Sequence, residues 1–454
     1  MIKNIAGKQY DLMTKSPVSK LIIKLSIPSV ITMLVNNIYN LVDTAFVGRL
    51  GTSASGAVGI VFGFMAIIQA FGFMFGQGSG SVLSRALGSK DKERANTNAS
   101  SGFFGSFLCG LMIMALGFIF LDKLVLFLGS TDTIAPYAKD YIFYILLAAP
   151  FMCSSLTLNN ILRYEGKAAL GMAGLMTGAL VNMAMDPLFM FGLKLGISGA
   201  GMATAFGQIL SWGILLYMFI SGRTSSKLSL KKALTAEFGV YTNIMATGTP
   251  SLLRQILNSI STVLLNLCCG PYGDAAVAAM SIVSRIVFFA FSVALGIGQG
   301  FQPVSAFNYG AGKYSRIRKG YRFTVIASEM VMIIGCTILV IFAKELVGIF
   351  RDDAEVIRIG ERALRLQALS NLLLPPFMAT EMLFQTTGKR LEASIISAFR
   401  SGIVFIAVLL ILSNLRGLAG IQEAQPLSLV LSFPICIPFL IRFFKDLPQA
   451  DKED

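Results

Sequence analysis

The sequence has 454 residues, of which 55% are hydrophobic and only 14% are charged, whereas a typical soluble domain carries about 25% charged residues. Apolar runs close to the ~20 residues that a helix needs to cross a bilayer recur along the whole length. These figures exclude an ordinary soluble protein and predict an all-α polytopic membrane protein.

Charge and residue usage narrow the function further. The formal charge of +14 is spread over short loops between apolar runs, so we interpret it as a topology signal and expect no nucleic-acid partner. Histidine is absent, and the six cysteines lie in apolar runs without CxxC spacing, so no metal or redox site is expected from them. No nucleophile–base pair or phosphate-binding loop is found, which argues against an enzyme.

Taken in chain order, the apolar runs predict twelve transmembrane helices. A polar, basic segment over residues 1–20 leads into the first run without the features of a cleaved signal peptide. The expected helices cover residues 21–47, 54–81, 97–120, 134–157, 167–190, 197–220, 243–269, 276–303, 320–343, 361–385, 391–413 and 425–444.

The positive charges predict the orientation of these helices. With an even number of spans, both termini lie on one side of the membrane. The loops and termini on that side hold about 25 of the 38 Lys and Arg residues, and cytoplasmic loops are the basic ones. Both termini are therefore expected in the cytoplasm.

The chain repeats itself at a constant offset of 222 residues. The coincidences include Pro28 with Pro250, Gly76-Gln77-Gly78 with Gly298-Gln299-Gly300, and Gly166-Lys167 with Gly388-Lys389. Each half holds six spans, so the two halves have the same orientation and a binding site is expected between them. We expect an N-terminal lobe at 1–220, a cytoplasmic linker at 221–242 and a C-terminal lobe at 243–454.

A polar stripe interrupts the first span. In "NNIYNLVDTAFV", Asn36, Tyr39, Asn40 and Asp43 lie on one helical face. A charge at the centre of a bilayer costs at least ~2.5–3.5 kcal/mol, yet the repeat aligns Asp43 with Leu265. Because the duplicated scaffold does without this acid, we favour a functional role over a structural polar contact.

The fifth span carries a second acid in "VNMAMDPLFMFG". Asn182 and Asp186 are four residues apart on one face, and Pro187 cannot donate a hydrogen bond to the carbonyl of Met183 and kinks the helix. Together with the Thr204 hydroxyl on the sixth span, these oxygens suit a hard cation such as Na⁺, or a proton shared with Asp43. As with Asp43, a purely structural contact is the alternative.

Two further acids lie in the second half. Glu381, in "FMATEMLFQTTGK", is a candidate for attracting a cationic substrate, and equally for a hydrogen-bonded packing residue. Glu329 has only Ser328 as a polar companion, so we favour a structural role for it.

Glycines recur at four-residue spacing, as in "GFMFGQGSGS" and at Gly174 and Gly178. No strand precedes the first of these motifs, so it is not a dinucleotide-binding fingerprint. Small residues at this spacing instead predict close packing of membrane helices.

Several of these motifs together resemble the MATE (multidrug and toxic compound extrusion) family, in its bacterial form. They are "YNLVDTAFVGRLG" on the first span, "GQG" in the second span of each half and "RYEGK" after the fourth. The resemblance implies two six-helix bundles around a central cavity and export of organic cations or lipophilic drugs in exchange for H⁺ or Na⁺. It covers nearly the whole chain.

The resemblance also implies roles for individual residues. The cation site of the family is similar to Asp43, Asn182, Asp186 and Thr204 here, and these four would also be the metal ligands if the ion is Na⁺. Tyr39 and Asn159, with Asn36 and Asn40 of the same stripe, would line that site or the adjoining cavity. Some relatives carry an acid where this chain has Asn258. Some relatives also bend the first helix at a proline. By this resemblance Pro28 would be a hinge, and Pro187 is the second hinge candidate.

The expected mechanism is alternating access of a monomer in the bacterial cell membrane. Binding of H⁺ or Na⁺, the only cofactor expected, would neutralise the acids and shift the population of states, so that a small hydrophobic cation leaves outward. A flippase for lipid-linked saccharides is the alternative, although it would need several basic residues for pyrophosphate, and only Arg254 and Arg285 are candidates within spans. A membrane-embedded enzyme is the other rival.

Overall fold

The computed structural model describes residues 2–452, apart from the side chains of residues 2–6, 8, 41, 45 and 52. Helices dominate these residues, and no strand occurs among them. The chain forms two compact units. The first comprises the residues up to Ser16 together with Ile31–Leu252, and the second comprises Pro17–Val30 together with the residues from Leu253 onward.

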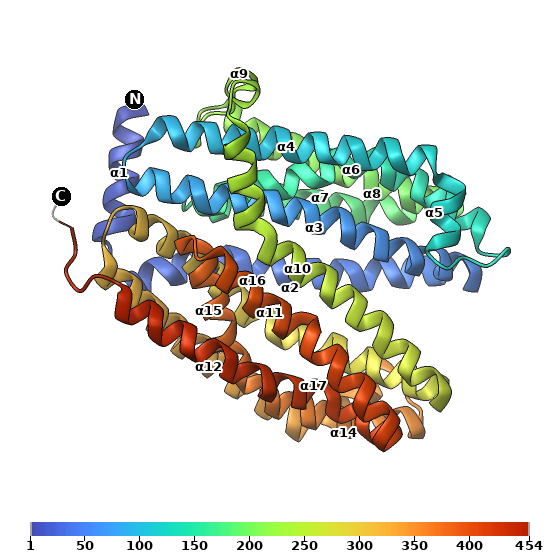
Figure 1. Cartoon of the computed structure of the whole chain (residues 1–454). Coiled ribbons are helices and arrows are strands. Elements are labelled where there is room, and N and C mark those ends of the chain that lie inside the picture. Colours follow the sequence, from blue (N-terminus) through green and yellow to red (C-terminus); the bar gives the residue numbers. More distant parts are fainter. Residues whose placement is uncertain (1, 453–454) are drawn as a thin grey trace. The chain divides into compact units, whose positions relative to one another are not determined.

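The first unit is built from helices of the N-terminal half, several of which lie side by side along most of their length (Figure 1). Its elements are α1 (Ile2–Lys15), the later part of α2 (Val18–Gly48), α3 (Thr52–Gly88), α4 (Lys92–Ile119), α5 (Leu121–Phe127), α6 (Ala135–Tyr164), α7 (Ala168–Pro187), the π-helical turn η1 (Leu188–Gly192), α8 (Gly196–Ile220), α9 (Leu230–Leu234) and the early part of α10 (Phe238–Cys269).

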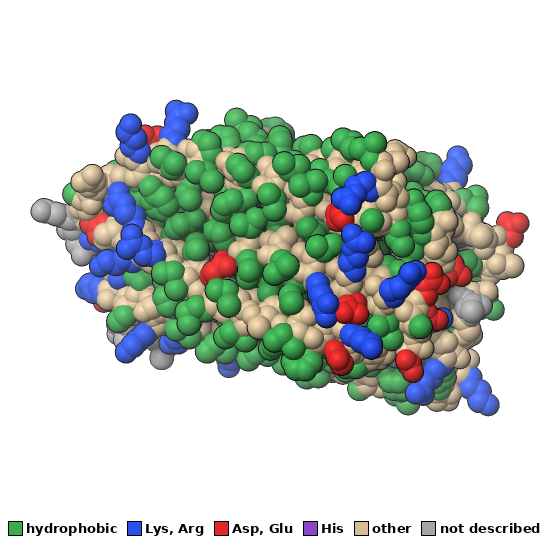
Figure 2. All heavy atoms as spheres, turned by 90° about the horizontal axis from the view of Figure 1, so that it is seen from below, with side chains coloured by type: hydrophobic (Ala, Val, Ile, Leu, Met, Phe, Trp, Pro, Cys, Tyr) green, Lys and Arg blue, Asp and Glu red, His purple; other side chains and the backbone are tan. Residues whose placement is uncertain are grey.

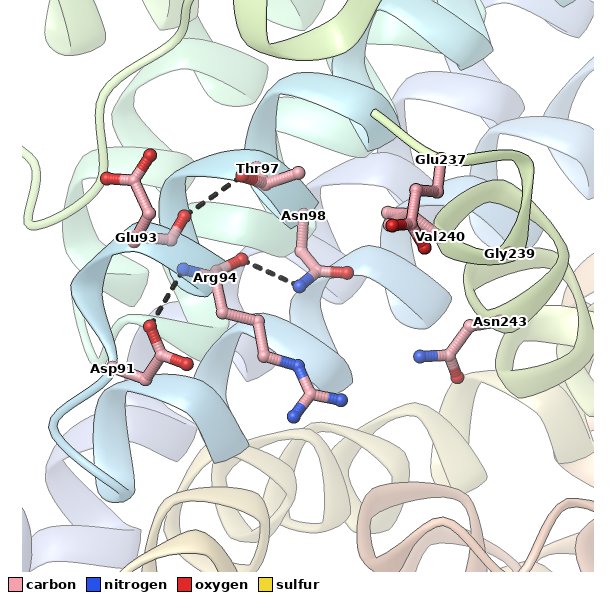
Figure 3. A pocket seen from close by; sticks show the side chains of 9 residues that line it. All are labelled: Asp91, Glu93, Arg94, Thr97, Asn98, Glu237, Gly239, Val240 and Asn243. Atoms are coloured by element: carbon pink, nitrogen blue, oxygen red, sulfur yellow. Dashed lines mark hydrogen bonds between the residues drawn. The ribbon is translucent and has the colours of Figure 1, made fainter. Parts of the chain in front are cut away.

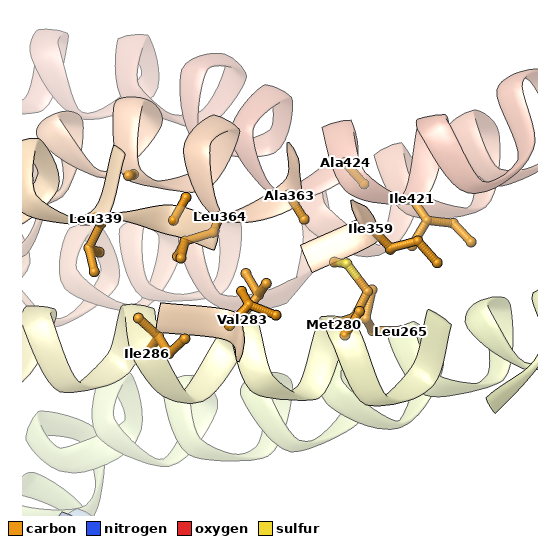
Figure 4. Packing of buried hydrophobic residues seen from close by; sticks show 14 of the residues in the cluster. Leu265, Met280, Val283, Ile286, Leu339, Ile359, Ala363, Leu364, Ile421 and Ala424 are labelled. Atoms are coloured by element: carbon orange, nitrogen blue, oxygen red, sulfur yellow. The ribbon is translucent and has the colours of Figure 1, made fainter. Parts of the chain in front are cut away.

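The second unit takes the rest of α2 and α10 and the helices of the C-terminal half. They are η2 (Gly270–Tyr272), α11 (Asp274–Gly310), α12 (Tyr314–Ile341), α13 (Ala343–Phe350), α14 (Ala354–Ser370), η3 (Asn371–Leu373), α15 (Leu374–Thr387), α16 (Arg390–Ala398), the π-helical turn η4 (Phe399–Ile403) and α17 (Val404–Asp446). A core of hydrophobic side chains from α10, α11, α12, α13, α14 and α17 holds it together (Figure 4).

Ten stretches among the described residues are long and apolar enough to cross a membrane. Broad areas of hydrophobic side chains also cover the face in Figure 2, as expected of a surface in contact with lipid. The last stretch, Arg390–Asp446, is 57 residues long, but the backbone leaves the helical conformation inside it at Gly417, where φ is +59°. A glycine tolerates this left-handed value, which strains other residues.

The tenth predicted span, 361–385, is interrupted in the structure. It lies on α14 and α15, which are separated by the short turn η3. The break precedes Pro375 and Pro376, which cannot donate backbone hydrogen bonds and disfavour helical geometry in the residue before them. Neither piece therefore reaches the length of a span alone, which is why this segment is missing from the ten stretches.

The segment after α8 packs back onto the first unit. The buried carboxylate of Glu165 accepts hydrogen bonds from the backbone nitrogens of Ser225 and Ser226, at 2.7 and 2.9 Å. Lys167 donates to the carbonyl of Arg223 at 2.7 Å. Burial lowers the pKa of Lys167, and the neighbouring Glu165 carboxylate opposes that shift. Much of the predicted linker 221–242 is thus held in place.

Each half of the chain contains an equivalent contact, at positions related by the sequence repeat. In the first unit, the backbone nitrogen of Lys227 donates to Asn96 near the start of α4, at 2.7 Å. In the second unit, Arg318 near the start of α12 donates to the carbonyl of Leu447, also at 2.7 Å. Asn96 and Arg318 are 222 residues apart, so in each half the segment after the last helix returns to the same place.

Candidate functional site

The last turns of α7 place an amide and a carboxylate on one buried face. Asn182 and Asp186 are 3% and 0% exposed, and their spacing of four residues stacks them one turn apart. Directly after Pro187 the chain continues as the π-helical turn η1, in which Leu193 N donates to Leu188 O. Such π-turns often occur at functional sites.

Glycines bring α8 unusually close to this face of α7. A Cβ atom added to Gly207 would lie 2.8 Å from the carbonyl oxygen of Gly178 and 2.9 Å from Cβ of Asn182. Only glycine allows such an approach. It lets the Asn182 amide donate to the hydroxyl of Thr204, which is 1% exposed, at 3.3 Å.

Asp43, on α2, is the fourth residue of this polar group. Asp43 is 2% exposed, and the structure brings it close enough to Asp186 for the two carboxylates to interact electrostatically. Tyr39, one turn earlier on α2, and Tyr141 on α6 interact with both acids. We call Asp43, Asn182, Asp186 and Thr204 the acid site.

The acid site has several oxygens without a partner. Oδ1 of Asp43, Oδ1 of Asn182 and both carboxylate oxygens of Asp186 are buried and accept no hydrogen bond from the described residues. Buried polar atoms are normally satisfied, and buried carboxylates need a cation or a proton. These oxygens suit one monovalent hard cation or shared protons. No group of three or more Asp, Glu, His or Cys side chains that could hold a metal ion occurs within residues 2–452.

The other residues predicted around this site are more scattered. Asn36 and Asn40 follow the stripe of α2 and are partly exposed. Asn159 lies elsewhere: its side chain packs against Gly171 at the start of α7. It is 18 residues from Tyr141 on α6, or about 27 Å along a helix. The structure therefore does not bring Asn159 to the acid site.

Tyr141 is the residue that the sequence reading missed. Its ring is 1% exposed, and it stands directly after Asp140 at the start of an apolar run, with only the tyrosines Tyr137 and Tyr144 as hydroxyl-bearing neighbours on its own face. The sequence repeat could have pointed to Tyr141, because this tyrosine aligns with Ala363 at the offset of 222. Like the two acids, this hydroxyl is present in one half only.

In the second unit, Glu381 lies between two arginines. Its Oε1 accepts from Nη1 of Arg254 on α10 at 2.7 Å, and its Oε2 accepts from Nη2 of Arg400 on η4 at 3.1 Å. The carboxyl is 1% exposed. Of the two roles considered for Glu381, this geometry favours a bonded packing residue over an acid open to a substrate cation.

A surface cavity of about 430 Å³ lies in the first unit between the start of α4 and the start of α10 (Figure 3). Its polar lining includes Asp91, Glu93 and Glu237, and the amide of Asn98 donates to the carbonyl of Arg94 at 2.7 Å. None of the acid-site residues lines this cavity.

Comparison with known proteins places the chain among transporters of one family. A profile of the MatE family matches the chain twice, over residues 28–188 and 250–411, and the two matches begin 222 residues apart. The multidrug export protein MepA of Staphylococcus haemolyticus (strain JCSC1435) is 27% identical over 439 residues, covering 96% of this chain and 95% of that protein.

Solved structures of transporters are similar over nearly the whole chain. An outward-facing conformation of a multidrug resistance MATE family transporter of the MOP superfamily gives a TM-score of 0.91 at 25% identity, covering 98% of this chain and 99% of that one. A crystal structure of MATE in the straight conformation gives the same TM-score, identity and coverage.

Proposed function

The chain belongs to the MatE family, and we propose that it is an antiporter that exports organic cations and lipophilic drugs in exchange for H⁺ or Na⁺. Its relative MepA is named a multidrug export protein. The observation that carries the proposal is the acid site, where two interacting carboxylates are buried without a counter-charge among the described side chains of the first unit. Such a pair is costly in a membrane unless it takes up a cation.

The coupling step follows from charge. With both carboxylates ionised the site is doubly negative, and H⁺ or Na⁺ neutralises part of this charge. A ligand shifts a conformational equilibrium only through its different affinity for the two states. We propose that the ion binds one facing of the transporter more tightly than the other, so that ion entry and drug release drive alternating access.

The connections between the units support such a movement. The division of α2 falls between Val30 and Ile31, two residues after Pro28, and that of α10 falls between Leu252 and Leu253, two residues after Pro250. A proline inside a helix removes a backbone hydrogen bond and favours bending. We propose that both prolines are hinge positions, and that Pro187 shapes the acid site.

We propose twelve spans in two repeats, with both termini in the cytoplasm. The ten apolar stretches support this count when Gly417 divides the last stretch into two and residues 354–387 supply one more. The basic loops on the side of the termini support the orientation. We expect a monomer that uses no cofactor other than the coupling ion.

Voltage contributes only if net charge crosses the membrane. One H⁺ or Na⁺ exchanged for one monovalent organic cation moves no net charge, and each additional charge would contribute about 2.3 kcal/mol per 100 mV. Two carboxylates in one site give two positions that a proton or cation can neutralise. A lipid-linked saccharide flippase is less well supported, because a pyrophosphate calls for several basic residues, whereas Arg254 and Arg400 together carry only one positive charge in excess of Glu381.

The test is export of tetraphenylphosphonium from proteoliposomes with an imposed pH or Na⁺ gradient. We expect Asp43→Asn and Asp186→Asn each to abolish gradient-driven export while the protein still folds and inserts. Asp140→Asn is the matched control, because Asp140 is an exposed acid on α6. Wild-type export by either neutralised acid-site variant would refute the proposal.

A further inference from the structure

The second unit contains an ion cluster that the acid site does not involve. We call Arg254, Glu381 and Arg400 the arginine triad. Arg254 donates to one carboxylate oxygen of Glu381, and Arg400 donates to the other through Nη2 and Nε, at 3.1 and 3.2 Å. The three side chains come from α10, α15 and η4, so the triad ties three elements of one unit together.

The triad is not neutral. Two guanidinium groups face one carboxylate, which leaves one positive charge in excess. Each guanidinium has five N–H donors, and Glu381 takes one from Arg254 and two from Arg400. Neither arginine makes another ion pair or side-chain hydrogen bond within the described part of the chain. The excess charge and the spare donors therefore lack an acceptor there.

The exposed side of the triad is its positive side. The Glu381 side chain is 1% exposed, whereas the side chains of Arg254 and Arg400 are 15% and 11% exposed. A molecule that reaches the triad meets the guanidinium groups first, while the carboxylate is enclosed. An organic cation would be repelled, and an anionic group would find both charge and donors.

The repeat indicates that this charge is an addition to the scaffold. At the offset of 222, Arg254 aligns with Thr32, Glu381 with Asn159, and Arg400 with Gly178. The duplicated fold thus forms without any of the three charges. The two units carry opposite excess charge: negative at the acid site of the first, positive at the triad of the second. Ionisable groups inside spans are costly and are usually kept for function.

We propose that the arginine triad binds the anionic group, a carboxylate, sulfonate or phosphate, of an amphiphilic molecule that this transporter handles. The inference rests on the proposed function, since it extends the substrates from cations to zwitterions. Planar guanidinium groups match the geometry of carboxylate and phosphate oxygens. Glu381 neutralises one of the two guanidinium charges and so reduces the attraction for the anion. Arg400 lies on a π-turn, a feature common at functional sites.

The experiment compares two dyes that differ in one group. A rhodamine ethyl ester is a cation, and the corresponding free acid is a zwitterion with the same ring system. Each is titrated with the purified full-length protein in phosphatidylcholine nanodiscs, and binding is read by fluorescence anisotropy. We expect the wild type to bind the acid about tenfold more tightly than the ester, as one charge-assisted contact would give.

Substitutions then locate this preference. Arg400→Gln and Arg254→Gln are each expected to lower the acid-over-ester ratio to near one, and Arg400→Lys is expected to retain part of it. Arg285→Gln is the matched control, because Arg285 is an exposed arginine of the same unit that is not part of the triad. Adding phosphatidylglycerol to the nanodiscs distinguishes the source of the anion: competition with the acid would indicate a lipid phosphate as an occupant.

Several outcomes would overturn the inference. A wild-type ratio near one, or a ratio that survives both glutamine variants in correctly folded protein, excludes an anion position at the triad. If the glutamine variants do not fold, Glu381→Gln decides: it leaves two positive charges and should raise the ratio, and a fall contradicts the proposal. Failure of the proposed function appears separately, as absence of ester export by wild-type proteoliposomes. If neither dye binds to the wild type, the inference of an anion position at the triad fails, and the proposed function is still judged by the export measurement alone.

Discussion

Gly207→Ala tests whether the close approach of α7 and α8 builds the acid site. The added Cβ would lie 2.8 Å from the carbonyl oxygen of Gly178 and 2.9 Å from Cβ of Asn182. A backbone carbonyl cannot rotate away, so the helices must separate by about 0.5 Å to reach ordinary contact distances. The hydrogen bond from Asn182 to Thr204, already 3.3 Å long, would then be lost.

The expected change in stability is the sum of two opposing free-energy contributions. Overpacking of this kind costs about 1–3 kcal/mol, and replacing a mid-helix glycine by alanine returns about 0.5–1 kcal/mol. Loss of one hydrogen bond that orients the site costs about 1 kcal/mol, which corresponds to a roughly fivefold weaker affinity for the coupling ion.

The assay is export at a series of H⁺ or Na⁺ concentrations, with thermal stability measured by fluorescence-detected size exclusion. Gly213→Ala is the matched control, because Gly213 lies on the same helix and an added Cβ there meets nothing within 4 Å. The control should be as active and at least as stable as the wild type. If Gly207→Ala keeps wild-type stability and ion dependence, the reasoning about helix approach is wrong.

Three further predictions concern single side chains. Tyr141→Phe should fold normally, because the buried ring is kept, but should need several-fold more coupling ion for half-maximal export, since it loses a hydroxyl near both acids; unchanged ion dependence would remove Tyr141 from the site. Glu165→Gln should destabilise the first unit by about 3 kcal/mol, because the buried carboxylate accepts two backbone N–H groups. Trypsin should then cut residues 223–232 faster than in the wild type. The control is Glu93→Gln, at an exposed ion pair, which should change the stability by less than about 1 kcal/mol. Gly417→Ala should cost about 1–3 kcal/mol, because φ is +59° and the new Cβ would lie 2.8 Å from the Tyr272 hydroxyl; wild-type thermal stability would contradict this.

Hydropathy predicted most of the helices, because a bilayer demands long apolar segments whatever their partners are. Their ends and breaks were less predictable. The structure extends α11 to residue 310, splits the tenth predicted span at η3, and joins the last two predicted spans through a bend at Gly417. These features depend on local backbone geometry and on neighbours such as Tyr272, which hydropathy does not encode.

The residues of the candidate sites also differ in whether the sequence alone could predict them. Asp43, Asn182 and Asp186 could be found because each is polar in an apolar run and has no polar counterpart in the other half. The partners of Glu381 could not, because Arg254 and Arg400 meet it only through packing of α10, α15 and η4. Asn159 illustrates the limit of a single polar residue: its depth along α6 is set by the fold, and that depth keeps it from the acids.

The central claim is that the acid site binds the coupling ion, and ion counterflow tests it most directly. Proteoliposomes loaded with tetraphenylphosphonium and given no ion gradient are monitored with a pH-sensitive dye and with radioactive Na⁺. The account predicts that H⁺ or Na⁺ moves opposite to the organic cation in the wild type and that neither moves with Asp186→Asn. Organic cation flux without any counter-ion in the wild type, or undiminished counterflow in Asp186→Asn, would contradict it.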